Sequence, residues 1–165
     1  MSLENDIQQR EFRNESQKAI LNLLFTSYYI QDQMNMLFKQ YDITRQQYNV
    51  LRILRGQHPG HASVNLIRER MLDKMSDASR IVERLRIKNL VTRKNAEKDK
   101  RAVEVSITEN GLQILSEMQE AVDQFDALLN NLSEEETRQL NYLLDKIRDG
   151  KTSLHNAVNN EAALH

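Results

Sequence analysis

Arginine side chains recur at helical spacing in the stretch from Ser76 to Arg101, SDASRIVERLRIKNLVTRKNAEKDKR. At about 100° per residue, Arg84 falls about 40° from Arg80, so both guanidinium groups share one face of a helix. An apolar stripe falls on the opposite side: Ala78, Ile81, Val82 and Leu85. This pattern predicts an amphipathic helix over 76–89. A guanidinium group can donate two hydrogen bonds to a phosphate or to a guanine edge, so the expected chemistry is non-covalent recognition of nucleic acid.

The ends of this predicted helix carry suitable capping residues. Ser76 is the predicted N-cap, because its hydroxyl can accept a hydrogen bond from an unpaired backbone amide. Asp77 would lie in the first turn and complement the positive end of the helix dipole. Asn89 is the predicted C′ residue, because asparagine tolerates the left-handed backbone conformation.

Charge is distributed unevenly along the chain. The formal net charge is −1. The segment 68–101, however, holds twelve Lys and Arg against six acids, a net charge of +6, and the rest of the chain carries −7. A basic segment in an otherwise acidic protein is typical of phosphate contact, although a charged helix can also be an ordinary solvated surface.

Several function classes find no support in the 165 residues. The chain has no cysteine, and it lacks a glycine-rich phosphate loop, a nucleophile elbow and an HExxH motif. His58 and His61 lie close in sequence, but no neighbouring ligand completes a metal set. We therefore expect no enzyme activity, cofactor or metal. No apolar run approaches the roughly 20 residues of a membrane span, and the N-terminal residues lack signal-peptide features, so a cytoplasmic location is expected.

The segment before the basic stretch is predicted to form helices and one short strand. Apolar residues at spacings of three and four predict a long first helix over 4–41. Thr44 and Gln47 fit a capping box that opens a second helix, which ends at Gly56. A short strand is predicted over 61–64, and Asn65 is the predicted cap of a third helix.

The segment after the predicted helix 76–89 is predicted to form a β-hairpin and two more helices. Strands are predicted over 90–93 and 102–108, joined by a polar tip. Thr108 would cap a fifth helix with a continuous apolar stripe to Leu129, and Ser133 with Glu136 would cap a sixth that stops at Gly150. The remaining tail is polar and either frays or adds a short helix.

This order predicts a mainly α protein with a small β-hairpin, a winged helix-turn-helix flanked by helices. The predicted division is an N-terminal dimerisation helix over 1–43, the winged helix-turn-helix over 44–108, C-terminal dimerisation helices over 109–149, and a polar tail over 150–165. A single protomer would leave the stripes of the outer helices uncovered, so we expect a two-fold homodimer.

From Thr44 to Gly111 the chain resembles the MarR family of bacterial transcription regulators. The matching pieces are ITRQQYNVLRIL, LIRERMLDKMSDASRIVERLRIKNLVTR, the wing signature Asp99-Lys100-Arg101 and SITENG. The resemblance implies a homodimer with recognition helices in successive major grooves and wings in the flanking minor grooves of double-stranded DNA.

The resemblance also assigns roles to particular residues. Base and phosphate contacts fall on Ser79, Arg80 and Arg84. The minor-groove arginine of the wing falls on Arg101, which Asp99 would orient. Three further residues are predicted phosphate contacts: Ser76, Lys74 and Lys100.

Two positions depart from the family pattern. Ile87 falls among the charged residues, where a polar side chain is usual, and Asn89 replaces the usual glycine. Ile87 would instead pack on the wing or on a neighbouring helix.

Tyr28, Tyr29 and Tyr48 are candidates for a pocket that holds a small aromatic or anionic effector, as family members do, although the residues favour the alternative that each is a partly buried packing residue. The predicted function is that of a sequence-specific dimeric regulator, a ligand-responsive repressor acting at a pseudo-palindromic operator of a bacterial-type promoter. The alternative is a winged-helix module that binds protein and does not bind DNA specifically.

Overall fold

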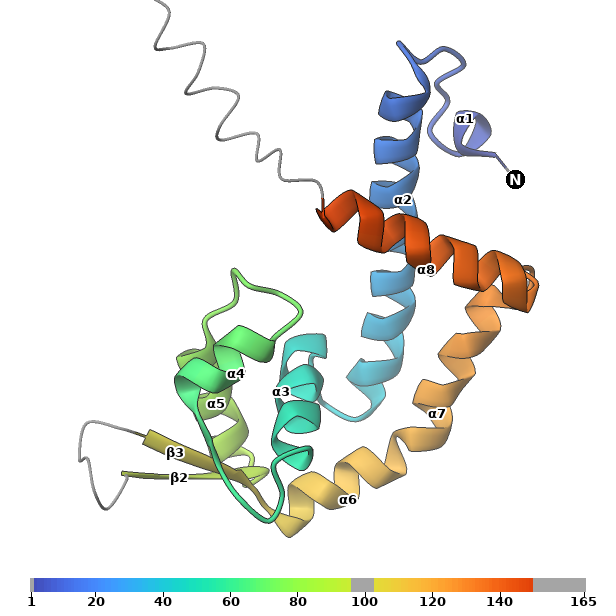
Figure 1. Cartoon of the computed structure of the whole chain (residues 1–165). Helices are drawn as coiled ribbons and strands as arrows, with labels where there is room; N and C mark the ends of the chain where they lie inside the picture. Colours follow the sequence, from blue (N-terminus) through green and yellow to red (C-terminus); the bar gives the residue numbers. More distant parts are fainter. Residues whose placement is uncertain (1, 96–102, 150–165) are drawn as a thin grey trace, which may run out of the picture. The chain divides into compact units, whose positions relative to one another are not determined.

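The computed structural model describes residues 2–95 and 103–149 (Figure 1). By its internal contacts the chain forms two compact units, residues 1–119 and 120–165. The described part is mainly helical with one small antiparallel sheet, as the sequence predicts. The division into segments 1–43, 44–108, 109–149 and 150–165 stays a prediction. No described helix is long and apolar enough to cross a membrane.

The first unit begins with two helices where the sequence predicted one. α1 (Leu3–Asp6) is a single turn, and α2 (Glu15–Gln40) starts only after Asn14, whose side chain accepts from the Gln17 amide at 2.9 Å. Between them Gln8 adopts a φ of 54°, which ends the helix. The prediction of one helix over 4–41 was wrong, because apolar periodicity did not reveal the asparagine cap.

A salt bridge joins α1 to α2. Lys18 Nζ lies 2.5 Å from Glu4 Oε1. This hydrogen bond to Lys18 is the main reason why the pKa of Glu4 is lowered to about 2.

α3 (Arg45–Arg55) begins with the predicted capping box. The Gln47 amide donates to the Thr44 hydroxyl at 3.2 Å, and the Thr44 amide donates to Gln47 Oε1 at 3.0 Å. Gly56 is the C-cap, as predicted.

α4 (Val64–Arg70) has a different cap from the one expected. Ser63 is its N-cap and accepts from the Leu66 amide at 3.1 Å. The prediction that Asn65 caps this helix was therefore wrong by two residues.

Three strands make the sheet in the order β1-β3-β2: β1 (Ala62–Ser63), β2 (Val91–Asn95) and β3 (Val103–Ile107). All neighbours are antiparallel, with Ala62 opposite Val105 on one side of β3 and Val91 opposite Ile107 on the other. The two predicted hairpin strands are confirmed, apart from one to two residues at their ends.

The core of the first unit lies where α3, α4, α5 (Ala78–Ile87), α6 (Glu109–Glu117) and the sheet meet. Its fully buried side chains come from all of these elements: Val50, Leu51, Leu54, Ile67, Val82, Leu85, Val105, Leu115 and Met118. Burial of this apolar set fixes α5 by its inner face, and the outer face stays exposed.

A close approach of two backbones joins α6 to the segment after α5. Thr108 caps α6 as predicted, accepting from the Gly111 amide at 3.1 Å, and its hydroxyl donates to the Asn89 carbonyl at 2.8 Å. A Cβ at Gly111 would collide with the Leu90 carbonyl oxygen and with the Ile107 side chain. Glycine is therefore required at this position.

Three helical elements follow α6: the short α7 (Gln119–Asp123), the 3₁₀ helix η1 (Gln124–Leu129) and the longer α8 (Glu134–Asp149). The predicted continuous helix to Leu129 is thus interrupted. Leu115 of α6 and its C-cap Met118 are buried, but no side chain in 119–149 is fully buried in the chain by itself. The Ser133 capping box is confirmed, with Ser133 N and Glu136 Oε2 2.7 Å apart. The predicted stop at Gly150 and the tail lie outside the described residues.

Candidate nucleic-acid interface

The helix α5 presents the predicted arginine face. Ala78, Val82 and Leu85 are buried, and Arg80 and Arg84 on the opposite side are exposed. Ser79 is exposed as well. Within the described residues neither Arg80 nor Arg84 forms a salt bridge. Both guanidinium groups are therefore available to an anion.

The cap of α5 is Asp77 and not Ser76. Asp77 Oδ1 accepts from the Arg80 amide at 3.1 Å, and the helix begins at Ala78. The Ser76 hydroxyl donates instead to Asp73 Oδ2 at 2.6 Å. The predicted N-cap at Ser76 was wrong. An aspartate side chain can cap a helix as well as a serine side chain, and the Ser76 hydroxyl is bonded to Asp73, three residues earlier in the chain.

The turn between α4 and α5 is held by side chains on both sides. The Leu72 amide donates to Asn49 Oδ1 on α3 at 2.9 Å. Asp73 Oδ1 accepts from the Met75 amide at 3.0 Å, in an Asx turn. The hydrogen bonds from Ser76 and then from Met75 lower the pKa of Asp73. Lys74, a predicted phosphate contact, donates from Nζ to the Glu69 carbonyl and is exposed.

The N-terminal ends of α3 and α5 border one hollow of about 290 Å³. Its lining brings together several predicted DNA contacts with the first turn of α3: Thr44, Gln46, Ser76, Asp77, Arg80, Ile81 and Arg84. Two helix starts and two arginines thus face the same space. Both features favour an anionic partner, because helix N-termini and guanidinium groups each attract negative charge.

The C-terminal end of α5 is bonded to its surroundings. Arg86 contacts Glu83 at 2.7 Å, which lowers the pKa of Glu83 and raises that of Arg86, and Arg93 of β2 lies 3.9 Å from the same carboxylate. Asn89 has a φ of 56°, which confirms the predicted left-handed cap. The cations here hold the helix and the sheet together.

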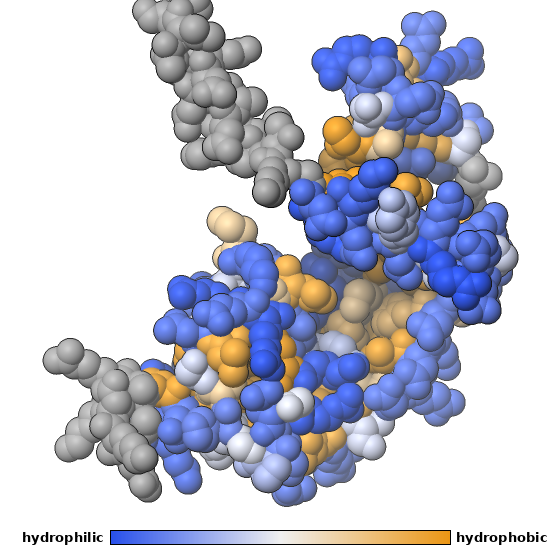
Figure 2. Space-filling model, in the orientation of Figure 1, coloured by the Kyte–Doolittle hydropathy of each residue, from blue (hydrophilic) through white to orange (hydrophobic). Residues whose placement is uncertain are grey.

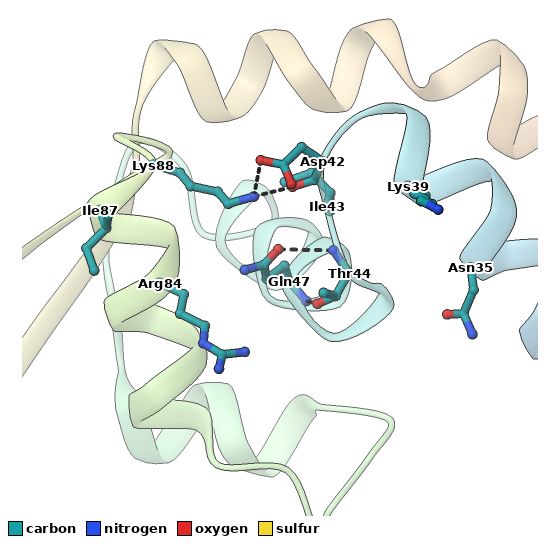
Figure 3. A pocket seen from close by; sticks show the side chains of 9 residues that line it. All are labelled: Asn35, Lys39, Asp42, Ile43, Thr44, Gln47, Arg84, Ile87 and Lys88. Atoms are coloured by element: carbon teal, nitrogen blue, oxygen red, sulfur yellow. Dashed lines mark hydrogen bonds and ion pairs between the residues drawn. The ribbon is translucent and has the colours of Figure 1, made fainter.

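Lys88 ties the same end of α5 to the junction of α2 and α3. Its Nζ lies 2.7 Å from Asp42 Oδ2 and also donates to the Asp42 carbonyl (Figure 3). Asp42 has a φ of 52°, so its backbone turns sharply between the two helices. Sequence reasoning missed this contact, because the two residues are 46 positions apart.

A second hollow, of about 500 Å³, lies beside this contact. Asn35 and Lys39 of α2 and Arg84 and Ile87 of α5 are among the residues that line it, and Figure 3 shows their positions. Ile87 is 66% exposed and borders this hollow, so the sequence position that departs from the family pattern lies at its rim.

The three tyrosines predicted for an effector pocket do not line either hollow. The Tyr48 ring is buried and stacks on Phe38 with centroids 4.9 Å apart, and its hydroxyl accepts from Arg52 at 3.0 Å. Tyr28 and Tyr29 on α2 are 64% and 52% exposed. Their ligand-binding role stays a prediction.

The wing residues Asp99, Lys100 and Arg101 lie outside the described residues, so their predicted contacts remain predictions. β2 and β3 end at Asn95 and begin at Val103 on either side of them. In the described ranges no three His, Asp or Glu side chains gather as a metal site. His61 contacts Glu104 of β3 at 3.2 Å.

Taken together, the helix pair α4–α5 with its turn, followed by the antiparallel strands β2 and β3, defines a winged helix-turn-helix protein. A family model described as the MarR family matches residues 41–102. The transcriptional regulator MgrA of Staphylococcus aureus is 32% identical over 130 residues, which cover 76% of this chain and 86% of MgrA. The transcriptional repressor IacR of Pseudomonas putida is 31% identical over 115 residues, covering 69% of this chain and 68% of IacR.

The solved structure of a mutant MarR from E. coli, complexed with operator DNA, matches with a TM-score of 0.71 and 25% identity. The match covers 84% of this chain and 99% of that one. The chain belongs to the MarR family and is a DNA-binding transcription regulator. The winged-helix module that binds only protein is not supported by these relatives.

Proposed function

We propose that the chain acts as a homodimer that binds a pseudo-palindromic operator in double-stranded DNA and represses transcription. The observation that carries the proposal is the exposed arginine face of α5, on which Arg80 and Arg84 have no acidic partner in the described part of the chain. Recognition helices of such motifs contact base edges through their N-terminal residues. Arg80 lies in the first turn of α5, and Arg84 follows one turn later.

Exposed apolar side chains support the dimer. On α2 seven large apolar residues are exposed: Ile20, Leu23, Leu24, Phe25, Tyr28, Tyr29 and Met36. The second unit carries four more: Leu129, Tyr142, Leu143 and Ile147. Apolar surface of this extent is typical of a protein interface, and a two-fold axis would bury the same residues of both protomers. Light scattering coupled to size-exclusion chromatography tests the dimer directly.

Repression is proposed by analogy with IacR, whose name describes a repressor. The proposed location is the cytoplasm, and no catalytic role is proposed, because the relatives are transcription regulators.

We further propose that a small aromatic or anionic effector releases the DNA. The hollow of about 500 Å³ supports this, because it combines the cations Lys39 and Arg84 with the apolar Ile43 and Ile87. Arg84 borders both hollows, so a ligand that binds its guanidinium group would compete with DNA for it. Titration of the protein–operator complex with benzoate is a first test, with cyclohexylmethanol as the uncharged control.

The test of DNA binding is a fluorescence anisotropy series at fixed moderate salt. A promoter fragment that contains the operator should bind about a thousandfold tighter than random duplex. The logarithm of affinity should also fall steeply with the logarithm of salt concentration, because phosphate contacts release counterions. Equal affinity for every fragment, including the region beside its own gene, would overturn the proposal.

A further inference from the structure

Two apolar side chains stand out from the turn that joins α4 to α5. Leu72 is 87% exposed and Met75 is 94% exposed. Every other large apolar residue in the described ranges is 66% exposed or less. Apolar surface is visible at the outer end of this turn in Figure 2, next to polar groups. Single exposed apolar residues are common, but here two lie three positions apart within the DNA-binding motif.

The exposure of this pair is fixed by the backbone around it. The Leu72 amide is bonded to Asn49, and Asp73 accepts from both the Met75 amide and the Ser76 hydroxyl. The preceding residue, Met71, is 1% exposed and anchors the turn in the core. The turn therefore presents Leu72 and Met75 outward in a defined position, which a frayed loop would not do.

The surroundings of the pair identify the partner. Lys74 lies between the two residues in the chain, and Arg80 follows in the first turn of α5. Met75 stands two residues before the N-cap Asp77, at the end of α5 that enters the major groove in motifs of this type. Of the charged groups around the pair, the carboxylates of Asp73 and Asp77 accept hydrogen bonds within the chain. The cations Lys74 and Arg80 are exposed and form no salt bridge within the described residues, so the complementary partner is a polyanion with apolar groups on its surface. Duplex DNA has these groups in its major groove, as the C5-methyl groups of thymine.

We propose that Leu72 and Met75 contact thymine methyl groups at the edge of each half-site, and so add a preference for thymine there. The inference rests on the proposed operator binding. Arginine reads hydrogen-bonding edges, whereas these two side chains would read a methyl group that offers no hydrogen bond. Lys74 would supply a phosphate contact that holds the turn in register but carries no sequence information.

The experiment is a deoxyuridine scan of the operator. The preferred site is first obtained by in vitro selection from random duplexes, and each thymine is then replaced by deoxyuridine, which lacks only the methyl group. Burying one methyl-sized group corresponds to about a fourfold change in affinity. We expect the wild-type protein to lose about that factor at one or more positions in each half-site, when measured by anisotropy.

The variants Leu72→Gln and Met75→Gln complete the test. Each should bind thymine and deoxyuridine equally at the position that its side chain contacts. The matched control is Lys74→Gln in the same turn, which should weaken operator and random duplex alike and leave the thymine preference unchanged. Because both apolar side chains are exposed, the variants should melt at the wild-type temperature, which circular dichroism checks.

The outcomes separate this inference from the function on which it rests. If the wild-type protein selects an operator but the scan shows no loss at any thymine, the inference is overturned and the proposed function stands. The inference is also overturned if both variants keep the wild-type ratio of thymine to deoxyuridine affinity. That result would favour a protein as the partner of Leu72 and Met75. If selection yields no preferred sequence at all, the proposed function itself fails.

Discussion

The cations of α5 fall into two groups. Arg80 in the first turn and Arg84 in the last turn are exposed and have no salt-bridge partner in the described part of the chain. At the C-terminal end Arg86 is bonded to Glu83, and Lys88 to Asp42. A net charge calculation treats all four alike, but only the first pair is free to bind another molecule. The local environment of a cation therefore indicates its role better than the charge of the helix.

The largest effect that would test this comparison is the loss of a free arginine. Arg84→Ala should weaken specific operator binding by roughly 1–3 kcal/mol if Arg84 contacts a base. The control is Arg86→Ala, because Arg86 is already paired with Glu83, and this variant should change the affinity for DNA far less. Anisotropy titrations at one salt concentration measure both. Equal losses in the two variants would contradict the comparison.

The segment that follows the C-terminus of α5 packs closely against the backbone at Gly111 of α6. Gly111→Ala should lower the free energy of unfolding by about 1–3 kcal/mol, because its Cβ meets the Leu90 carbonyl and Ile107. Gly56→Ala is the matched control. A Cβ at Gly56 would lie 3.4 Å from the nearest atom, the Ile53 carbonyl oxygen, so this variant should be neutral or slightly stabilised. Urea denaturation of both variants gives the comparison.

Loss of the N-cap of α5 should lower the stability of the protein. Asp77→Ala removes the acceptor of the Arg80 amide, so the free energy of unfolding should fall by about 1 kcal/mol. Ser76→Ala should cost less, since Ser76 does not cap the helix and loses only its bond to Asp73. Thermal melts rank the two, and the reverse order would restore Ser76 as the cap.

The smallest effect concerns the turn before α5 and depends on pH. The pKa of Asp73 is lowered in the fold, so its contribution to stability is present above the unfolded pKa of about 3.9 and is lost as pH falls through the lower, folded value. Asp73→Asn should therefore be less stable than wild type at pH 7. The urea midpoints of the two proteins should converge at acidic pH, and a constant gap would contradict this role.

Local signals in the sequence were enough to predict much of this architecture. The Thr44, Thr108 and Ser133 caps and the arginine face are all confirmed, because each depends on residues within four positions of one another. The two hairpin strands are also confirmed, because β-branched and apolar residues mark each strand within its own segment. The break before Asn14 and the Asp77 cap were mispredicted for a related reason. Several polar residues there could cap a helix, and only the folded geometry selects one.

Contacts between distant segments could not be predicted in the same way. The bond between Asn49 and the Leu72 amide joins positions 23 apart, and no periodicity of the chain encodes it. The same is true of the apolar pair on the turn, since sequence alone does not tell an exposed Leu72 from a buried Met71.

The bond between Lys88 and Asp42 connects the C-terminus of α5 to the junction of α2 and α3. A displacement of that junction would reach α5 through this bond. A helix of 10 residues is about 15 Å long, so a tilt of about 10° about its C-terminus would move its N-terminus by about 2.5 Å. That distance approaches the length of a hydrogen bond. Under the proposed binding to DNA, a small rotation of α5 is therefore enough to take Arg80, in its first turn, out of register with base edges.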